Sequence, residues 1–440
     1  MAAPERTGPG PRQHLTDRPI PARVPREPRG RLSTLRIPAF RLFLGAQFAS
    51  ALGDFMVAPA LAFAVLDLTG SPGDLGLVLA ARAVPVVVFM LLGGVLADRL
   101  PRHRVMIAAD VARVLGQGTA AVLVLTGSAA VWQLVVLQAV HGTASALFTP
   151  AVTGLVRDTV PPPARQGANA LRGMSQSAAM IGGPLLGTLL VLTAGTGWAI
   201  AADATTFAVS AACLALLRAP CSIRPPAPAR PLWSDLREGW REFSSRPWVW
   251  SMIVMASLTN MLYAVFTVLG PVLSERELGG RGAWGLLLTA FGAGAICGGA
   301  AALWVRPVRP LRAGLLAVAL FAAPPLVLSQ AGSPLPAALA VFLGGCGLML
   351  FNPLWETVLQ AGVPAAALSR VSAYEWFGSC AAQPLGLALA GPLAAHAGLR
   401  TTLLATGLGQ LLISLAPLAL REVREYPAPD QGTATEGNLQ

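Results

Sequence analysis

Two charged residues, Asp54 and Arg82, lie within long apolar stretches of the sequence, where an isolated charge is costly to bury. Helical rise places Asp54 about 16 Å and Arg82 about 12 Å from the same end of two consecutive stretches. At similar depths, an ion pair between them would offset much of their desolvation. A carboxylate that can exchange an arginine partner for a proton has the chemistry that proton coupling requires, which we favour over a fixed structural pair.

Four other polar residues in apolar stretches are further candidates. Asp110 and Arg113 are three residues apart, so they can pair on one helix face, and a stabilising pair is as plausible as a transport role. Asp203, about 9 Å inside the end of another stretch, is a second candidate to contact a proton or a cationic solute. His141 could titrate near neutrality, but we favour a packed, hydrogen-bonded histidine.

The sequence offers little for metal, disulfide or nucleotide chemistry. Its five cysteines form no C-x-x-C pair and it has four histidines, so we expect no metal site, no cofactor and no disulfide framework. It contains no lysine and hence no Walker A motif, which argues against ATP hydrolysis. An integral membrane enzyme would need a convergent catalytic cluster, and none is visible among the sparse acids and histidines.

Apolar blocks, each long enough to cross a bilayer as a helix of about 20 residues, must position these side chains. The 440-residue chain is 54% hydrophobic and 12% charged, unlike a soluble protein. We therefore predict an all-α integral membrane protein with twelve transmembrane helices, at 38–65, 74–97, 105–125, 130–154, 168–193, 197–217, 248–273, 283–304, 312–329, 335–358, 371–394 and 399–420.

The arginines predict the orientation of these spans. All 32 basic residues are arginine; 27 fall in the tails and in the connections on one side, against three in the connections on the other. This asymmetry predicts that both termini lie in the cytoplasm. The net charge of +11 then reflects topology and contact with membrane lipids, and not nucleic-acid binding, because no aromatic residues are interleaved with a basic surface.

The longest connection, 218–247, divides the spans into bundles at 38–217 and 248–421, between cytoplasmic tails at 1–37 and 422–440. The N-terminal tail is rich in Arg, Pro and Gly and is expected to be disordered. Aromatic and apolar residues spaced three and four apart over 233–243 predict an amphipathic helix at the membrane surface within the connection. A shift of 203 residues aligns 141–162 with 344–365, which indicates a duplicated six-helix unit and an alternating-access plan.

A charged hairpin between the second and third spans carries a motif. Residues 94–104 resemble the G-x-L-A-D-R-x-G-R-[KR] loop of the major facilitator superfamily, with Pro101 and His103 as departures. The matching residues are Gly94, Asp98, Arg99, Arg102 and Arg104. In the fifth span, Gly183, Pro184 and Gly187 resemble the G-P-x-x-G antiporter motif of exporters in that superfamily. The resemblance covers about 38–420 and implies two pseudo-symmetric bundles, the fold of that superfamily.

The resemblance also implies roles at the cytosolic surface. Asp98 would engage the start of span eleven when the transporter faces outward, while the hairpin arginines bind acidic residues or lipid phosphates. Independently of the resemblance, the topology places Glu356, Arg370 and Glu375 at the cytosolic ends of spans ten and eleven, where we expect a charge network that locks the inward gate together with Asp98. One departure limits the analogy: the arginine that many proton antiporters carry in the fourth span is Gln138 here.

These observations lead us to expect a secondary transporter that is monomeric and, by its composition, bacterial in origin. The resemblance to the drug-efflux and siderophore-exporter branch favours export of a bulky hydrophobic small molecule, such as an antibiotic, drug or siderophore, in exchange for protons. We expect Phe55, Met56, Met180, Phe266 and Trp376 to line its cavity. A nutrient importer of the same fold is the alternative, although the helices offer few polar groups for such a solute.

Overall fold

The computed structural model describes residues 33–99, 101–161, 164–217, 241, 244–363 and 365–428. Within helices it leaves out the side chains of 90–99, 153, 154, 157, 158, 365–367, 369, 370 and 373. The described chain is helical, without strands, and eleven of its segments are long and apolar enough to cross a membrane. The predicted all-α membrane fold is therefore confirmed. The interfacial helix predicted at 233–243 lies outside the described residues.

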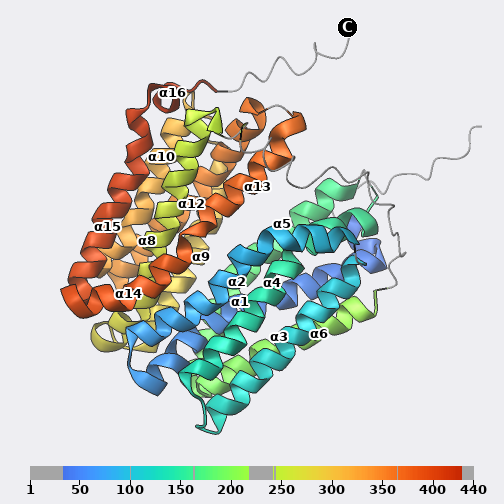
Figure 1. Ribbon diagram of the computed structural model, residues 1–440, viewed down its shortest axis with the longest axis vertical. Coiled ribbons are helices and arrows are strands. Elements are labelled where there is room, and N and C mark those ends of the chain that lie inside the picture. The colour runs from blue at the N-terminus through green and yellow to red at the C-terminus, as the bar shows by residue number, and fades with distance from the viewer. Residues whose placement is uncertain are drawn as a thin grey trace, which may run out of the picture.

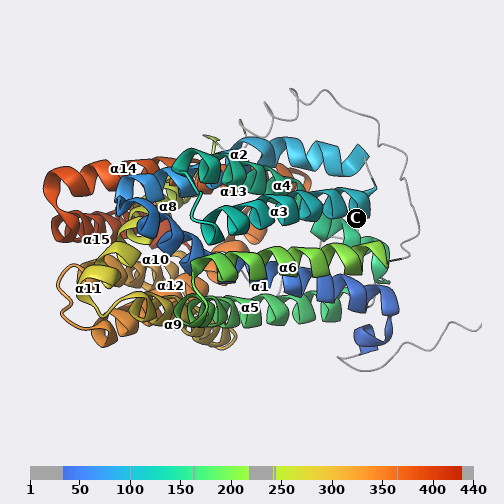
Figure 2. The ribbon, with the colours of Figure 1, turned by 90° about the horizontal axis from the view of Figure 1, so that it is seen from below.

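Two bundles of helices follow one another along the chain and lie side by side (Figures 1 and 2). The first contains α1 (Pro38–Thr69), α2 (Pro72–Arg99), α3 (Arg102–Leu125), α4 (Val131–Thr159), α5 (Arg165–Thr193) and α6 (Thr196–Ala215). The second contains α8 (Pro247–Glu277), α9 (Arg281–Ala302), α10 (Pro310–Ala319), α11 (Ala323–Leu328), α12 (Pro334–Gly362), α13 (Ala365–Ala381), α14 (Gln383–Ala397) and α15 (Leu399–Leu415).

The predicted span 371–394 is not one continuous helix. It is divided into α13 and α14, which meet at Ala382. The cause is Pro384 in the first turn of α14, since proline has no N–H to donate and its ring clashes with the preceding turn. The prediction of a single helix was therefore wrong here, and neither segment is among the eleven that are long and apolar enough to cross a membrane.

Helical structure continues beyond both outer boundaries that the sequence predicted for the bundles. Ser33–Arg36 form a 3₁₀ turn before α1, and the Thr34 side chain is buried. After α15, the short helix α16 (Arg421–Arg424) buries Val423, and the Tyr426 ring lies 5.2 Å from that of Trp248. Parts of the two predicted tails thus pack against the bundles.

The duplication inferred from the sequence is visible in the helices. A shift of 203 residues superposes the bounds of α4 on those of α12, and both helices are 29 residues long. Each contains a proline at the corresponding place, Pro150 and Pro353, and each ends at a valine with extended backbone. The two bundles are therefore copies of one helical plan.

Tight turns gather at one end of the bundles, which we call the glycine-turn face. Glycines with positive φ join consecutive helices at that end, where residues with a side chain would be strained: Gly70, Gly127, Gly195, Gly279, Gly280 and Gly398. The opposite end carries the described arginines of three connections, and we call it the arginine-rich face. By the arginine count, the arginine-rich face is the predicted cytoplasmic one.

The bundles share one hydrophobic core near the glycine-turn face and have separate cores near the arginine-rich face. The shared core contains Leu61 and Val78 from the first bundle with Phe266 and Trp284 from the second. Each bundle then has its own core toward the other face. The bundles accordingly touch at one end and diverge toward the other (Figure 1).

Glycines permit the close contact at the touching end. A Cβ on Gly76 of α2 would lie 2.2 Å from the Leu387 carbonyl oxygen of α14, so only glycine fits this approach. On the other side of the interface, a Cβ on Gly285 of α9 would lie 2.1 Å from the Thr188 hydroxyl oxygen of α5. An ion pair from Arg281 of α9 to Asp67 of α1 joins the same ends of the bundles.

Candidate functional site

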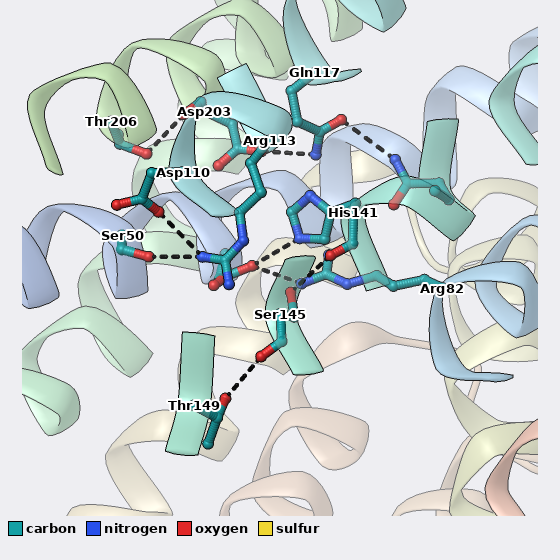
Figure 3. Close-up of polar contacts among 12 residues, drawn as sticks. Ser50, Arg82, Asp110, Arg113, Gln117, His141, Ser145, Thr149, Asp203 and Thr206 are labelled. Atoms are coloured by element: carbon teal, nitrogen blue, oxygen red, sulfur yellow. Dashed lines mark hydrogen bonds and ion pairs between the residues drawn. The ribbon is translucent and has the colours of Figure 1, made fainter. Parts of the chain in front are cut away.

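Asp54, Arg82 and His141 meet between α1, α2 and α4 of the first bundle. Figure 3 labels Arg82 and His141 of this cluster. Arg82 Nη2 donates to Asp54 Oδ1 at 2.6 Å, and His141 Nε2 lies 3.2 Å from the same oxygen. The Asp54 and Arg82 side chains are 30% and 26% exposed, while His141 is 1% exposed. The pairing predicted from helical depth is confirmed, and His141 is a packed, hydrogen-bonded residue as expected.

Two glycines bring the helices close enough to form this cluster. A Cβ on Gly142, next to His141, would lie 2.1 Å from the Arg82 carbonyl oxygen, so α4 packs directly on the α2 backbone. Gly53, next to Asp54, would in the same way meet Thr206 and Asp203 of α6. The acid and its partners are thus held by backbone contacts that tolerate no added side chain.

Asp110 and Arg113 form a second, fully enclosed cluster. Arg113 Nη1 donates to Ser50 Oγ at 3.1 Å and lies 3.5 Å from Asp110 Oδ1, while Ser210 Oγ donates to Asp110 Oδ2 at 2.6 Å. The Arg113 guanidinium lies between the rings of Phe148 and Phe207, 4.5 and 5.1 Å from their centroids. Since Arg113 and Asp110 are at most 2% exposed, this arrangement favours the stabilising role that the sequence left open.

Asp203 is fully buried and is bound by an amide. Gln117 Nε2 donates to Asp203 Oδ2 at 2.8 Å, and Gln138 Nε2 donates to Gln117 Oε1 at 3.3 Å. Asp203 Oδ1 has no hydrogen-bond partner among the described residues. Gln138 therefore extends a chain of amides toward this acid (Figure 3 shows the link between Gln117 and Asp203).

Sequence reasoning missed Ser50, Ser210 and Gln117 as members of these clusters. Serines and glutamines scattered in apolar helices give no pattern of their own. The available signal for Gln117 was its place seven residues after Asp110, two helical turns along the same face of α3.

Aromatic rings occupy the positions in the second bundle that correspond to these charges. Tyr263 lies at the same distance from the start of α8 as Asp54 does from the start of α1. Likewise, Phe321 follows the start of α10 by as many residues as Arg113 follows the start of α3. Gly345 of α12, the counterpart of Gly142, approaches the carbonyl oxygen of Phe291, as Gly142 approaches that of Arg82. The Tyr263 ring is 4.5 Å from that of Phe321 and 6.1 Å from that of Phe291. One duplicated position thus holds charges in the first bundle and stacked rings in the second.

A cavity of about 260 Å³ lies in the second bundle between α8, α12 and α13. Its lining includes Met252, Met255, Phe351, Trp355, Glu375 and Trp376. Of the five residues predicted to line a cavity, Trp376 is found here, whereas Met56 and Phe266 are buried in packed cores, so their prediction was wrong. Helices that are apolar all round do not reveal from sequence which residues face inward.

Glu375 contacts Trp355 in this cavity, while the charge network expected from the sequence is described only in part. Trp355 Nε1 donates to Glu375 Oε1 at 3.3 Å, while the neighbouring Glu356 side chain is exposed. The side chain of Arg370, the third member of the expected network, lies outside the described residues.

The two remaining predicted motifs are described to different extents. Gly183 and Gly187 of α5 pack against α1, where a Cβ on Gly187 would lie 2.1 Å from the Met56 carbonyl oxygen, and Pro184 is buried inside the helix. In the hairpin, α2 ends at Arg99, but the side chains of Gly94, Asp98 and Arg99 are outside the described residues. Arg102 and Arg104 lie in the first turn of α3.

Several known transporters are similar to this chain. The multidrug efflux pump Tap of Mycobacterium tuberculosis is 29% identical over 417 residues, which is 90% of this chain and 96% of Tap. The enterobactin exporter EntS of Escherichia coli O157:H7 is 28% identical over 421 residues, 91% of this chain and 96% of EntS.

Solved structures share the fold at low sequence identity. A peptide transporter POT in complex with sulfate has a TM-score of 0.69 at 16% identity, covering 87% of this chain and 94% of its own. The nucleoside transporter NupG has a TM-score of 0.68 at 11% identity, covering 88% of this chain and 98% of its own. The model of the Major Facilitator Superfamily matches residues 43–387. The chain is a multi-pass membrane protein that belongs to the Major Facilitator Superfamily.

Proposed function

We propose that this protein exports a bulky hydrophobic small molecule by alternating access, in exchange for protons. The observation that carries the proposal is the Asp54 cluster, a partly exposed acid within the membrane that is shared by an arginine and a histidine. Such a cluster can exist in two states, because the acid can hold either its cationic partner or a proton. That exchange is the elementary step a proton-driven carrier needs.

Binding of a proton to Asp54 would weaken its ion pair with Arg82. Arg82 belongs to α2, which also packs against α14 of the second bundle near the glycine-turn face. A change in the pairing of Arg82 can therefore alter the packing of α2 at the interface between the bundles. Asp203, buried one helix away with Oδ1 unpartnered among the described residues, is a candidate second site for the proton.

The state of the bundles fits the first half of an export cycle. They touch near the glycine-turn face and diverge toward the arginine-rich face (Figure 1). If the arginine-rich face is cytoplasmic, as the arginine count predicts, this state admits solute from the cytoplasm. The efflux role of Tap and the exporter role of EntS support the outward direction.

The proposal is tested by dye accumulation in cells that express the full chain. Nile red, which is neutral, and rhodamine 6G, which is a cation, should both be tried, with and without a protonophore. We expect lower accumulation of at least one dye in expressing cells, and loss of this effect with the protonophore or with Asp54→Asn. Asp74→Asn, in the first turn of α2 outside the cluster, is the control and should retain export.

Two results would count against the proposal. Export that persists undiminished in the Asp54→Asn variant would remove Asp54 from proton coupling. Greater accumulation in expressing cells would favour a nutrient importer, the alternative considered from the sequence.

A further inference from the structure

We propose that the cavity between α8, α12 and α13 binds the cationic group of an organic cation, with Glu375 as its counter-ion. This inference rests on the proposed function in that it names the class of solute. It starts from the environment of the Glu375 carboxylate. Among the described residues Glu375 accepts a hydrogen bond from Trp355 and has no ion pair.

Three acids in the interior of the first bundle are already satisfied or closed off. Asp54 is held by Arg82 and His141, and Asp110 by Arg113 and Ser210. Asp203 is 0% exposed and borders no described cavity. Glu375 differs because it is partly accessible and lines an open space.

The described helix that faces Glu375 supplies no cation to it. The described part of α12, the facing helix, contains no arginine or histidine. A carboxylate in such a setting is stabilised by a cation that arrives from outside the protein.

The walls of the cavity suit a cation that carries apolar groups. Trp355, Trp376 and Phe351 offer aromatic faces, which attract cations electrostatically. Met252 and Met255 add flexible, polarisable thioethers that adapt to ligands of different shape. A strongly hydrated small ion would lose its water here without enough oxygen ligands in return.

The size of the cavity indicates that it holds only part of the solute. Its volume of about 260 Å³ is smaller than the roughly 300–1,000 Å³ of sites that enclose a whole drug-sized molecule. Trp376, which is 52% exposed, lies at its lining and can cover a group that extends beyond it. We therefore assign the cationic group to Glu375 and the rest of the molecule to the space between the bundles.

The test compares two probes of similar shape and different charge. Methyltriphenylphosphonium is a cation and triphenylphosphine oxide is neutral; both are measured by equilibrium dialysis against the purified full chain in lipid nanodiscs. We expect the wild-type protein to bind the cation more tightly, and Glu375→Gln to weaken cation binding by about tenfold with little change for the neutral probe. Retained binding of the neutral probe also shows that the variant is folded.

Glu356→Gln is the matched control, because Glu356 is an exposed acid on α12 next to Trp355 and does not line the cavity. Because its charge acts on Glu375 only through space, it should lower cation affinity far less than Glu375→Gln does and leave the affinity for the neutral probe unchanged. Equal cation binding by the wild type and Glu375→Gln would overturn the inference, as would an equal loss in Glu356→Gln. Cation binding that depends on Glu375 without any export in cells would instead refute the proposed function and leave the binding site standing.

Discussion

Among the described residues, the ion pair between Arg281 and Asp67 connects the two bundles at the glycine-turn face. The Arg281 guanidinium also lies 5.4 Å from the centre of the Phe63 ring on the same α1 helix. Both contacts must break when this end of the bundles opens. We predict that Arg281→Ala shifts the protein toward the state that is open at the glycine-turn face.

The size of the shift follows from the exposure of the contacts. The Arg281 and Asp67 side chains are 27% and 44% exposed, so their ion pair contributes about 0.2–1 kcal/mol. The cation–π contact with Phe63 adds about 0.5–1 kcal/mol at such a site. Together they stabilise the closed state by about 1.4 kcal/mol, which corresponds to a roughly tenfold change in the ratio of the two states.

Electron paramagnetic resonance distances can measure this ratio. Spin labels at Ser128→Cys in the first bundle and Ser333→Cys in the second report the separation across the glycine-turn face, after the five native cysteines are replaced by serine. Glu277→Gln is the control, since Glu277 pairs with Arg400 on the same face but within the second bundle. An unchanged distance distribution in Arg281→Ala, or an equal shift in Glu277→Gln, would refute the reasoning.

Two further predictions concern stability and use the thermal unfolding of the purified protein. Gly187→Ala should destabilise it by about 1–3 kcal/mol, because the new methyl group would meet the Met56 carbonyl oxygen, whereas Gly173→Ala has nothing within 4 Å and should not. Arg113→Met should destabilise it by about 3–5 kcal/mol by leaving Asp110 buried without its cation. Adding Asp110→Asn should restore part of that loss, and a double variant no more stable than Arg113→Met would contradict the pairing.

The sequence predicts the helices and the ion pair between Asp54 and Arg82 well, because the lengths of the apolar blocks constrain both. An apolar block that matches the thickness of a bilayer leaves the chain few alternatives to a helix. Once Asp54 and Arg82 are on neighbouring helices, rise per residue alone sets their depths, and the pair forms as expected. The repeat at 203 residues likewise predicted the correspondence of α4 and α12.

The rotation of each helix about its axis could not be predicted in the same way. A helix that is apolar all round gives no stripe to indicate which face points inward. For this reason Phe266 was expected at a cavity but packs in the core, and the contact between Glu375 and Trp355 was not predicted. The break at Ala382 did have a signal in the sequence, because Pro384 lies inside the predicted span.

The arrangement of charges in the first bundle also bears on how the chain can enter the membrane as it is synthesised. Asp110 precedes Arg113 on the same helix, α3. Asp54 lies on α1, and its partner Arg82 follows on α2. Each of these arginines is therefore synthesised after the acid with which it pairs. Neither arginine has to enter the bilayer as an unpaired cation before later helices are made. The order of acid and base along the chain thus eases insertion as well as shaping the finished site.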